Sequence, residues 1–257
     1  MLFLLSPAKK LDYDSALPAL PHTQPRFVPQ SAELIQVLRQ LSTDDIAALM
    51  SLSPALAQLN HDRYAQWEPS FTDADSRQAI LAFNGDVYEG LDARTLAPKD
   101  LEWAQQHLAI LSGLYGVLRP LDLMRPYRLE MGTRLETAQG KTLYAYWGTQ
   151  IAHALREQLA ESKGPVINLA SEEYFKAVDQ KALSAEIVQC VFQDWKNGAW
   201  KIISFHAKRA RGLMARHAIE QRARTLDDLR SFDSEGYRYD AAASSTTKLV
   251  FRRRLED

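Results

Sequence analysis

Two kinds of hydrophobic pattern alternate along this 257-residue chain. Short apolar runs at residues 2–5 and 166–169 are typical of buried strands, and further strands are predicted at residues 187–195, 237–239 and 249–251. Longer segments place apolar residues at helical spacing, which predicts helices at residues 31–41, 43–50, 54–67, 77–83, 98–111, 144–159 and 207–224. Strands at the start, middle and end, separated by blocks of helices, predict an α/β (α+β) fold: a single domain over residues 1–257, with a mixed sheet flanked by helices.

The mixed character of the sheet follows from one turn. Asn197-Gly198 lies between the predicted strand 187–195 and a second apolar run at residues 200–205. A type I′ turn needs positive φ at both central residues, and Asn-Gly meets that need best. We therefore expect an antiparallel hairpin here, which excludes a purely parallel sheet.

Composition indicates in which cellular compartment the protein is located. The single cysteine, Cys190, excludes an intrachain disulfide and a multi-cysteine metal site, as a reducing compartment permits. The opening apolar run ends at Ser6-Pro7, too soon for a signal peptide, and no segment approaches the roughly 18 apolar residues that span a bilayer. We expect a cytoplasmic protein with no membrane partner.

Positive charge is concentrated in one segment, although the formal net charge is −1. Residues 200–224 contain seven basic residues and one acidic residue. On a helix, Lys208, Arg211 and Arg222 are expected to lie near one another, with the apolar residues toward the core. Such a stripe suits phosphates, and the alternative is a solvated face whose long aliphatic stems cover apolar neighbours. Further basic residues at element ends and turns favour phosphate binding: Lys9, Lys10, Arg119, Arg125, Arg128 and Arg209.

A second candidate site lies at residues 108–121, where two helical patterns are joined by a turn containing Gly113 and Gly116. Glycines let a backbone approach a ligand closely, and the N–H groups of the helix begun by Pro120 would favour a phosphate. The segment resembles a helix-hairpin-helix element, a non-specific binder of the DNA backbone, although its glycines are separated by two residues instead of one. The alternative is a tight turn that packs Tyr115 into the core.

A third candidate site follows the buried run 166–169. Ser171 can cap a helix, which would explain it fully. In the functional alternative, Asn168, Ser171 and Glu172 form a strand-end site with Ser6, Lys9 and Lys208. Motifs for metal, phosphate-loop, dinucleotide or serine-hydrolase chemistry are absent from the sequence, so no metal site and no cofactor are predicted. Cys190, within an apolar strand, is expected to be a buried hydrophobic residue.

Several blocks together resemble the YaaA family, a bacterial group associated with resistance to hydrogen peroxide. They are residues 5–9, 83–91, 111–123, 126–132, 168–176 and 207–214, and the resemblance runs from Met1 to about Arg253. It implies a cytosolic protein made under peroxide stress that limits iron-dependent damage. It also implies a single-domain α/β fold with a positive cleft and a helix-hairpin-helix-like DNA-binding element.

The leading hypothesis is a monomeric protein that binds double-stranded DNA without sequence preference. Its phosphate contacts would come from Lys9, Lys10, Gly113, Gly116, Arg119, Arg125, Arg128, Lys208, Arg209 and Arg211. The alternative is an enzyme acting on a nucleotide or nucleic acid in a strand-end cleft, with Ser6, Asn168, Ser171 and Glu172 as its candidate catalytic residues. Glu172 would then act as general base near a lysine.

Overall fold

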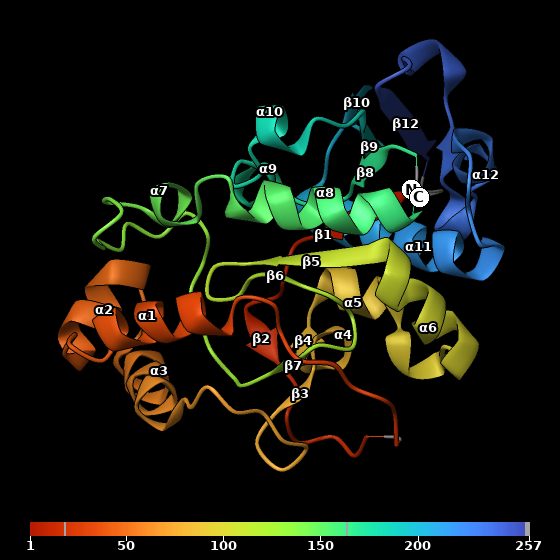
Figure 1. Cartoon of the computed structure of the whole chain (residues 1–257). Coiled ribbons are helices and arrows are strands. Elements are labelled where there is room, and N and C mark those ends of the chain that lie inside the picture. Colours follow the sequence, from red (N-terminus) through yellow and green to blue (C-terminus); the bar gives the residue numbers. More distant parts are fainter. Residues whose placement is uncertain (18, 163, 255–257) are drawn as a thin grey trace.

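The centre of the molecule is a mixed sheet with the strand order β11-β12-β9-β8-β1-β5-β6, in which β10 pairs with β9 (Figure 1). This computed structural model describes residues 1–17, 19–162 and 164–254. The inner strands β12, β9, β8, β1 and β5 are parallel, whereas β6, β10 and β11 pair antiparallel with their neighbours. The strands are β1 (Leu2–Leu5), β5 (Leu108–Ser112), β6 (Gly116–Leu118), β8 (Val166–Asn168), β9 (Ile187–Lys196), β10 (Ala199–Lys201), β11 (Arg238–Tyr239) and β12 (Lys248–Arg253).

Helices cover both faces of this sheet. In the view of Figure 1, α8 (Gln150–Ser162) lies above β5, and α5 (Asp86–Leu91) and α6 (Pro98–His107) lie below it. The other helices are α1 (Val28–Leu38), α2 (Thr43–Met50), α3 (Pro54–Gln66), α4 (Ala79–Ala82), α7 (Leu143–Trp147), α9 (Glu172–Phe175), α10 (Gln180–Leu183), α11 (Ser204–Gln221) and α12 (Leu226–Arg230). The prediction of a single-domain α/β fold with a mixed sheet flanked by helices is confirmed.

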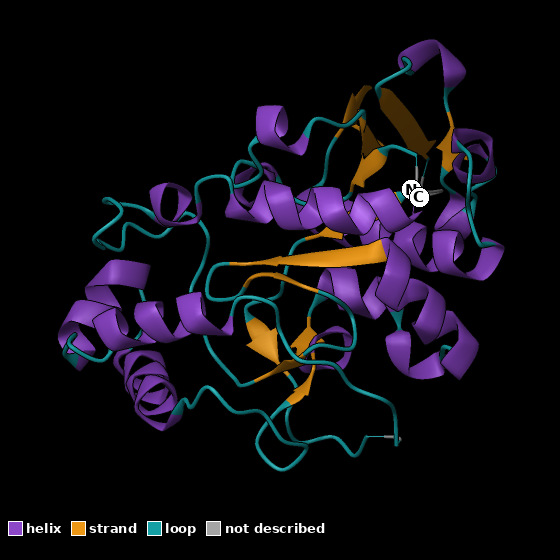
Figure 2. Cartoon of the chain, viewed as in Figure 1, coloured by secondary structure: helices purple, strands orange, loops and turns teal. Residues whose placement is uncertain are grey.

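Away from the central sheet, Figure 2 shows short orange strands among loops and helices. They form two small antiparallel pairs: β2 (Lys10–Leu11) with β4 (Phe83–Asn84), and β3 (Arg77–Gln78) with β7 (Leu123–Met124). Three 3₁₀ turns complete the described elements, at Ala93–Thr95, Ser234–Gly236 and Ala241–Ala243. Within the described residues, no helix is long and apolar enough to cross a membrane.

The buried strand β1 explains why the start of the chain is apolar at four consecutive positions. All four side chains of β1 are buried, because β5 and β8 flank it on either side and helices cover both faces. Phe3, for example, lies opposite Leu108 of β5 and Ile167 of β8. The predicted strands at residues 2–5 and 166–169 are therefore confirmed.

The Asn197-Gly198 hairpin is confirmed as well. Asn197 has φ of 53° and Gly198 has φ of 75°, as a type I′ turn requires, and β9 and β10 pair antiparallel on either side. The second strand is shorter than expected, because it ends at Lys201 and helix α11 begins at Ser204. The predicted strands near the C-terminus are present as β11 and β12, which pair antiparallel.

The predicted pair of helices at residues 108–121 is wrong. The helix that begins at Pro98 ends at His107, and β5 and β6 then form an antiparallel hairpin. All five side chains of β5 are buried. A short, wholly apolar run fits a buried strand and a buried helix equally well, and here pairing with β1 decides for the strand. Pro120 begins no helix, because it lies in a turn before β7.

Gly113 and Gly116 have packing roles in this hairpin. A Cβ on Gly113 would lie 2.2 Å from the carbonyl oxygen of Leu129, and one on Gly116 would lie 2.7 Å from the Trp147 ring. Both glycines are buried and neither lines the pocket at the sheet edge, so nothing in their surroundings supports the expected phosphate contacts. Tyr115 between them is fully buried, as the alternative of a tight turn predicted, although a strand and not a helix precedes the turn.

The other differences between the predictions and the structure concern where helices begin and end. Gly148, with φ of 47°, separates α7 from α8 within the predicted helix 144–159. The first helix begins at Val28 and not near Ser31. The predicted helix 77–83 is only the short α4 between two-residue strands. Helix α5, which follows the Asn84-Gly85 turn, was not predicted.

Candidate nucleic-acid interface

A pocket of about 450 Å³ opens at the carboxyl ends of β1 and β8. The chain crosses from β1 to β5 on one side and later returns to β8 on the other, so the strand order reverses at β1. In α/β folds this point leaves a crevice that ligands occupy. Helix α11 and four other segments line the pocket: residues 6–10 after β1, residues 84–87 before and within α5, residues 127–130, and Ser171, Glu173 and Tyr174 around the start of α9.

Two serines join the strand ends at the base of this crevice. The backbone N–H of Ser171 donates to Oγ of Ser6 at 2.9 Å, and the Ser6 hydroxyl donates to Oγ of Ser171 at 3.3 Å. Ser171 stands at the N-cap of α9, but its side chain accepts no capping hydrogen bond, so the predicted capping role is wrong. The Tyr88 hydroxyl donates to the Ser6 carbonyl at 3.1 Å and further fixes the loop after β1.

Close packing of two helices forms one wall. A Cβ on Gly212 of α11 would lie 1.8 Å from the carbonyl oxygen of Val87, and a Cβ on Gly90 of α5 would lie 2.3 Å from that of Arg209. The helices therefore meet backbone to backbone, which only glycine permits here. This contact places the start of α5 beside Lys208 and Arg211, and all three line the pocket.

The structure brings five of the predicted basic residues to this pocket: Lys9, Lys10, Arg128, Lys208 and Arg211. Lys9 and Arg128 both pair with Glu130, at 2.8 Å and 3.1 Å. No carboxylate of residues 1–17, 19–162 or 164–254 lies within ion-pair distance of Lys10, Lys208 or Arg211. Three carboxylates, those of Asp86, Glu130 and Glu173, also line the pocket, so its cationic excess is modest and comes from these unpaired groups.

Arg211 is the most enclosed of the unpaired cations. Lys10 and Lys208 are exposed at the rim, whereas Arg211 is half-buried. Burial lowers the pKa of its guanidinium from the ordinary value, and the nearby Glu172 opposes that shift. Because a guanidinium stays charged in proteins, this site holds a partly desolvated cation without an ion-pair partner. An anion entering the pocket would supply that partner.

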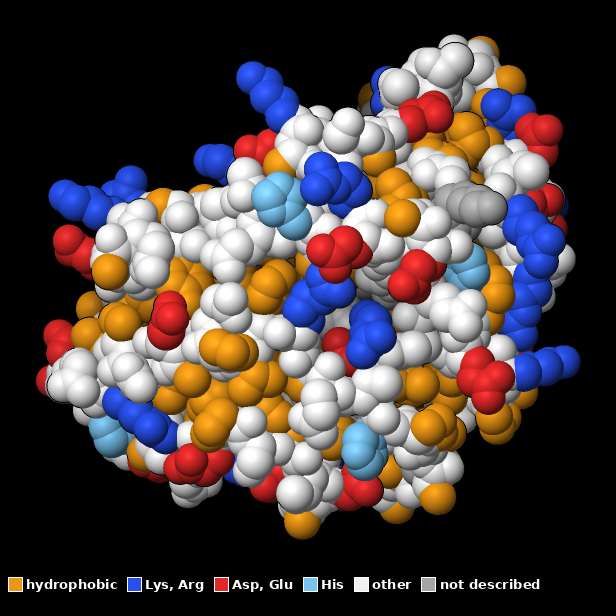
Figure 3. Space-filling model, in the orientation of Figure 1, with side chains coloured by type: hydrophobic (Ala, Val, Ile, Leu, Met, Phe, Trp, Pro, Cys, Tyr) orange, Lys and Arg blue, Asp and Glu red, His pale blue; other side chains and the backbone are white. Residues whose placement is uncertain are grey.

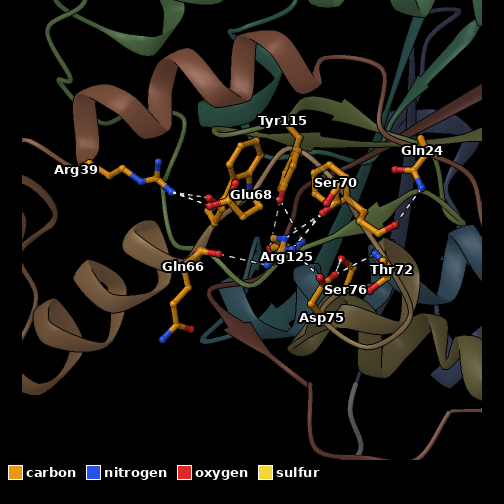
Figure 4. Close-up of polar contacts among 12 residues, drawn as sticks. Gln24, Arg39, Gln66, Glu68, Ser70, Thr72, Asp75, Ser76, Tyr115 and Arg125 are labelled. Carbon is orange, nitrogen blue, oxygen red and sulfur yellow. Dashed lines mark hydrogen bonds and ion pairs between the residues drawn. The ribbon is translucent and has the colours of Figure 1, made fainter.

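Three predicted phosphate contacts lie outside this pocket and have partners of their own. Arg119 pairs with Asp122 at 3.1 Å, and Arg209 pairs with Glu235 at 2.7 Å. Figure 4 shows the third, Arg125, at the centre of a cluster of oxygen atoms. Its guanidinium donates to the carbonyl groups of Gln66 and Ser70 and to the carboxylate of Asp75, the last at 2.6 Å.

The predicted row of basic side chains on α11, formed by Lys208, Arg211 and Arg222, is not continuous. Arg222 caps the far end of the helix and pairs with Asp100 at 2.6 Å, so it does not join Lys208 and Arg211. The positions between them on the same face, Ala215 and Ala218, are buried. The basic segment read from the sequence thus divides into a cleft group and a structural group.

The residues of the alternative hypothesis are partly assembled. Ser6, Lys9, Ser171 and Lys208 all line the pocket. Asn168 does not, because it is buried and its side-chain oxygen accepts from the N–H of Ala170 at 2.9 Å. Glu172 is exposed beside the pocket.

Sequence reasoning missed the contribution of residues 84–87 and of the rings of Tyr127 and Tyr174 to the pocket. The Asn84-Gly85-Asp86 turn was visible in the sequence, but nothing in its pattern showed that the start of α5 reaches α11.

Cys190 is buried, as the sequence predicted, and burial raises the pKa of its thiol to about 12. The side chain is therefore almost entirely protonated at neutral pH and is a poor nucleophile. Among the described residues, no three His, Cys, Asp or Glu side chains are grouped so as to hold a metal ion.

The face with α8 in front differs from the cleft. In Figure 3 basic and acidic side chains are interspersed on this face, with hydrophobic surface between them. A second pocket of about 310 Å³ is lined by residues of both signs, including Arg26, Arg119, Asp122 and Glu157. Because Arg26 pairs with Glu157 at 2.5 Å and Arg119 with Asp122, its basic groups are already neutralised.

Comparison with known proteins identifies the family of this chain. A family model described as peroxide stress protein YaaA matches residues 1–243. A UPF0246 protein of Bordetella petrii is 69% identical over 99% of this chain and 100% of that protein. A UPF0246 protein of Bordetella avium is 67% identical over the full length of both, and one of Paracidovorax citrulli is 62% identical over 99% of each. This chain belongs to the YaaA family of peroxide stress proteins.

Proposed function

We propose that this protein binds duplex DNA without sequence preference through the basic cleft, and thereby limits iron-dependent oxidative damage during peroxide stress. The cleft is defined by Lys9, Lys10, Arg128, Lys208 and Arg211. The observation that carries the proposal is the convergence on one pocket of three cations that have no carboxylate partner within the described part of the chain. We further propose that the protein acts as a monomer in the cytoplasm.

Charge distribution supports this proposal more than total charge does. The formal net charge is −1, so the whole molecule is not attracted to DNA as a polycation would be. Unpaired cations in a cleft gain partners when phosphates arrive, and the condensed counterions of the DNA are released. The paired cations outside the cleft would have to exchange one partner for another.

The peroxide role has a chemical reason. Ferrous iron bound to DNA converts hydrogen peroxide into hydroxyl radical at the place where it is bound. A protein that covers DNA keeps iron and peroxide from meeting on it. Family membership supports a role in peroxide stress, and the cleft supplies the proposed means.

The test is a titration of fluorescent duplex DNA, followed by anisotropy at several salt concentrations. Lys208→Ala/Arg211→Ala should weaken binding and reduce the slope of log affinity against log salt by roughly one to two. The matched control is Lys99→Ala/Lys248→Ala, which removes the same charge from two exposed lysines that do not line the pocket. Binding that is insensitive to salt, or equally affected by both double variants, would contradict the proposal.

An enzyme acting on a nucleotide or nucleic acid is the second candidate. The observation that favours it is the hydrogen-bonded pair Ser6 and Ser171 at the point where the strand order reverses. Glu172 would be its general base, beside Arg211. Incubation of wild type, Ser171→Ala and Glu172→Gln with nucleotides and with oxidised duplex DNA tests this candidate. Turnover by wild type that both variants lose would support it, and absence of turnover would contradict it.

A further inference from the structure

The size of the pocket sets a limit on what can enter it. Its volume of about 450 Å³ falls within the range of roughly 300–1,000 Å³ typical of small-molecule sites. A stretch of duplex cannot enter such a space, so a bound duplex would rest on the rim. One base with its sugar and phosphate is a ligand of suitable size.

The lining also matches the chemistry of a single nucleotide. Apolar side chains, among them Pro7, Val87 and Leu129, form part of the wall and suit the faces of a base. Asn84 and Asp86 provide an amide and a carboxylate that could meet the polar edge of a base. Arg211, half-buried and without an ion-pair partner among the described residues, is placed for the phosphate of the same nucleotide.

Two exposed hydrophobic side chains, Ile202 and Phe205, precede the pocket residue Lys208 by six and three residues in the chain. Ile202 is 60% exposed and Phe205 is 59% exposed, more than any other large hydrophobic residue that the structure describes. Phe205 precedes Lys208 by three residues on α11, so the two occupy neighbouring positions on one side of the helix. Apolar side chains in such positions can enter between base pairs and unstack them.

We propose that the cleft receives one nucleotide rotated out of the duplex, with Phe205 and Ile202 inserted in the stack that the nucleotide leaves. Lys10 and Lys208 at the rim contact the flanking phosphates, and Arg211 contacts the phosphate of the extruded nucleotide. This inference rests on the proposed DNA binding and names the part of the DNA that the pocket takes. The ligand class is a single unpaired nucleotide within a duplex.

The free-energy cost of extruding a nucleotide predicts which duplexes the protein binds most tightly. Rotating a nucleotide out of a duplex costs the pairing and stacking that it loses, and this cost is smallest for a mismatched or damaged base. Duplexes with one mismatch should therefore bind more tightly than fully paired ones, by about tenfold for each 1.4 kcal/mol of pairing saved.

The experiment uses the full chain and a duplex of about 20 base pairs with one central 2-aminopurine. Stacking quenches the fluorescence of this base, so extrusion should raise its emission several-fold at saturating protein. Anisotropy of a dye at the end of the same duplex reports DNA binding separately. The mismatched duplex should show the larger emission and the higher affinity.

Two variants and one control make the test specific. Phe205→Ser removes the exposed ring, and Ala8→Phe fills the pocket from its lining while keeping every basic side chain. Both should bind the duplex but lose most of the gain in 2-aminopurine emission. Leu59→Ser is the control, because Leu59 is 43% exposed on α3 and does not line the pocket, and it should behave as wild type.

The two readouts separate the possible failures. If wild type binds the duplex with a normal salt slope but 2-aminopurine emission does not rise, extrusion is overturned and DNA binding stands. If no duplex binds at low salt, both proposals are overturned. If Phe205→Ser and Leu59→Ser give the same emission as wild type, the wedge assignment is wrong even if the base leaves the stack.

Discussion

The basic cleft and the cluster around Arg125 both contain cationic side chains, but they differ in how many of these side chains have a carboxylate partner. Arg125 is 14% exposed, and it donates to two carbonyl groups and to the carboxylate of Asp75 (Figure 4). In the cleft, Lys10, Lys208 and Arg211 line a pocket without an ion-pair partner among the described residues.

Pairing with a carboxylate separates structural cations from binding ones. A buried charge is stable only when it is paired and hydrogen-bonded, so the Arg125 cluster is explained by folding alone. Folding does not explain cations left unpaired beside a pocket, and an external anion does. Removing a cation should therefore affect stability in one region and binding in the other.

The largest expected effect is on stability. Arg125→Ala should lower the free energy of unfolding by about 3 kcal/mol, because it removes the guanidinium that donates to Oδ2 of Asp75 and to two carbonyl groups. Denaturant titration measures this loss. Lys208→Ala/Arg211→Ala should stay within about 0.5 kcal/mol of wild type in the same measurement. Equal losses in the two variants would remove the distinction between the regions.

A smaller loss of stability is expected when a substitution disturbs the cleft without removing a charge. Gly212→Ala places a methyl group 1.8 Å from the carbonyl oxygen of Val87, so α5 and α11 must separate. We expect a loss of about 2 kcal/mol of stability from this overpacking and weaker DNA binding by the folded protein. Ala218→Gly, elsewhere on α11, serves as the control with unchanged DNA affinity. Normal DNA affinity of Gly212→Ala would show that the cleft does not depend on this contact.

The smallest effect concerns the pH dependence of a paired carboxylate. Hydrogen bonds from the backbone and side chain of Ser15 lower the pKa of Asp12 from its ordinary 3.8 to about 2. The stability from this carboxylate is therefore present above about pH 4 and is lost as pH falls toward 2. Asp12→Asn should flatten the pH dependence of unfolding between these values, as measured by denaturant titration in acid. If Asp12→Asn and wild type lose stability in the same way as pH falls, Asp12 is not the carboxylate responsible.

Local signals in the sequence were sufficient for several elements. The Asn197-Gly198 turn determines its hairpin, because few other dipeptides tolerate positive φ at both positions. The apolar run at Leu2–Leu5 is long enough to need burial on both faces, so an inner strand follows. Residues 108–112 were misread because a wholly apolar run has no periodicity that separates strand from helix.

The candidate site could be predicted only in part. Lys9, Lys10, Arg128, Lys208 and Arg211 were recognised as basic residues near turns and on a helix, and the structure brings them to one pocket. Arg119, Arg125 and Arg209 carry the same charge in the sequence, yet they have carboxylate partners elsewhere. Two of those partners, Asp75 of Arg125 and Glu235 of Arg209, are distant in the chain, and no local pattern identifies them.

Sequence patterns alone were enough for the fold class, the hairpin, the buried strands β1 and β8 and the family, because each depends on local preference or on long blocks of similar residues. Only folding decided which cations of the described residues lack a carboxylate partner. It did so through contacts between segments far apart in the chain, such as Gly212 against Val87 and Ser171 against Ser6. A residue's charge is a property of the chain, whereas its pairing depends on the distances that folding creates.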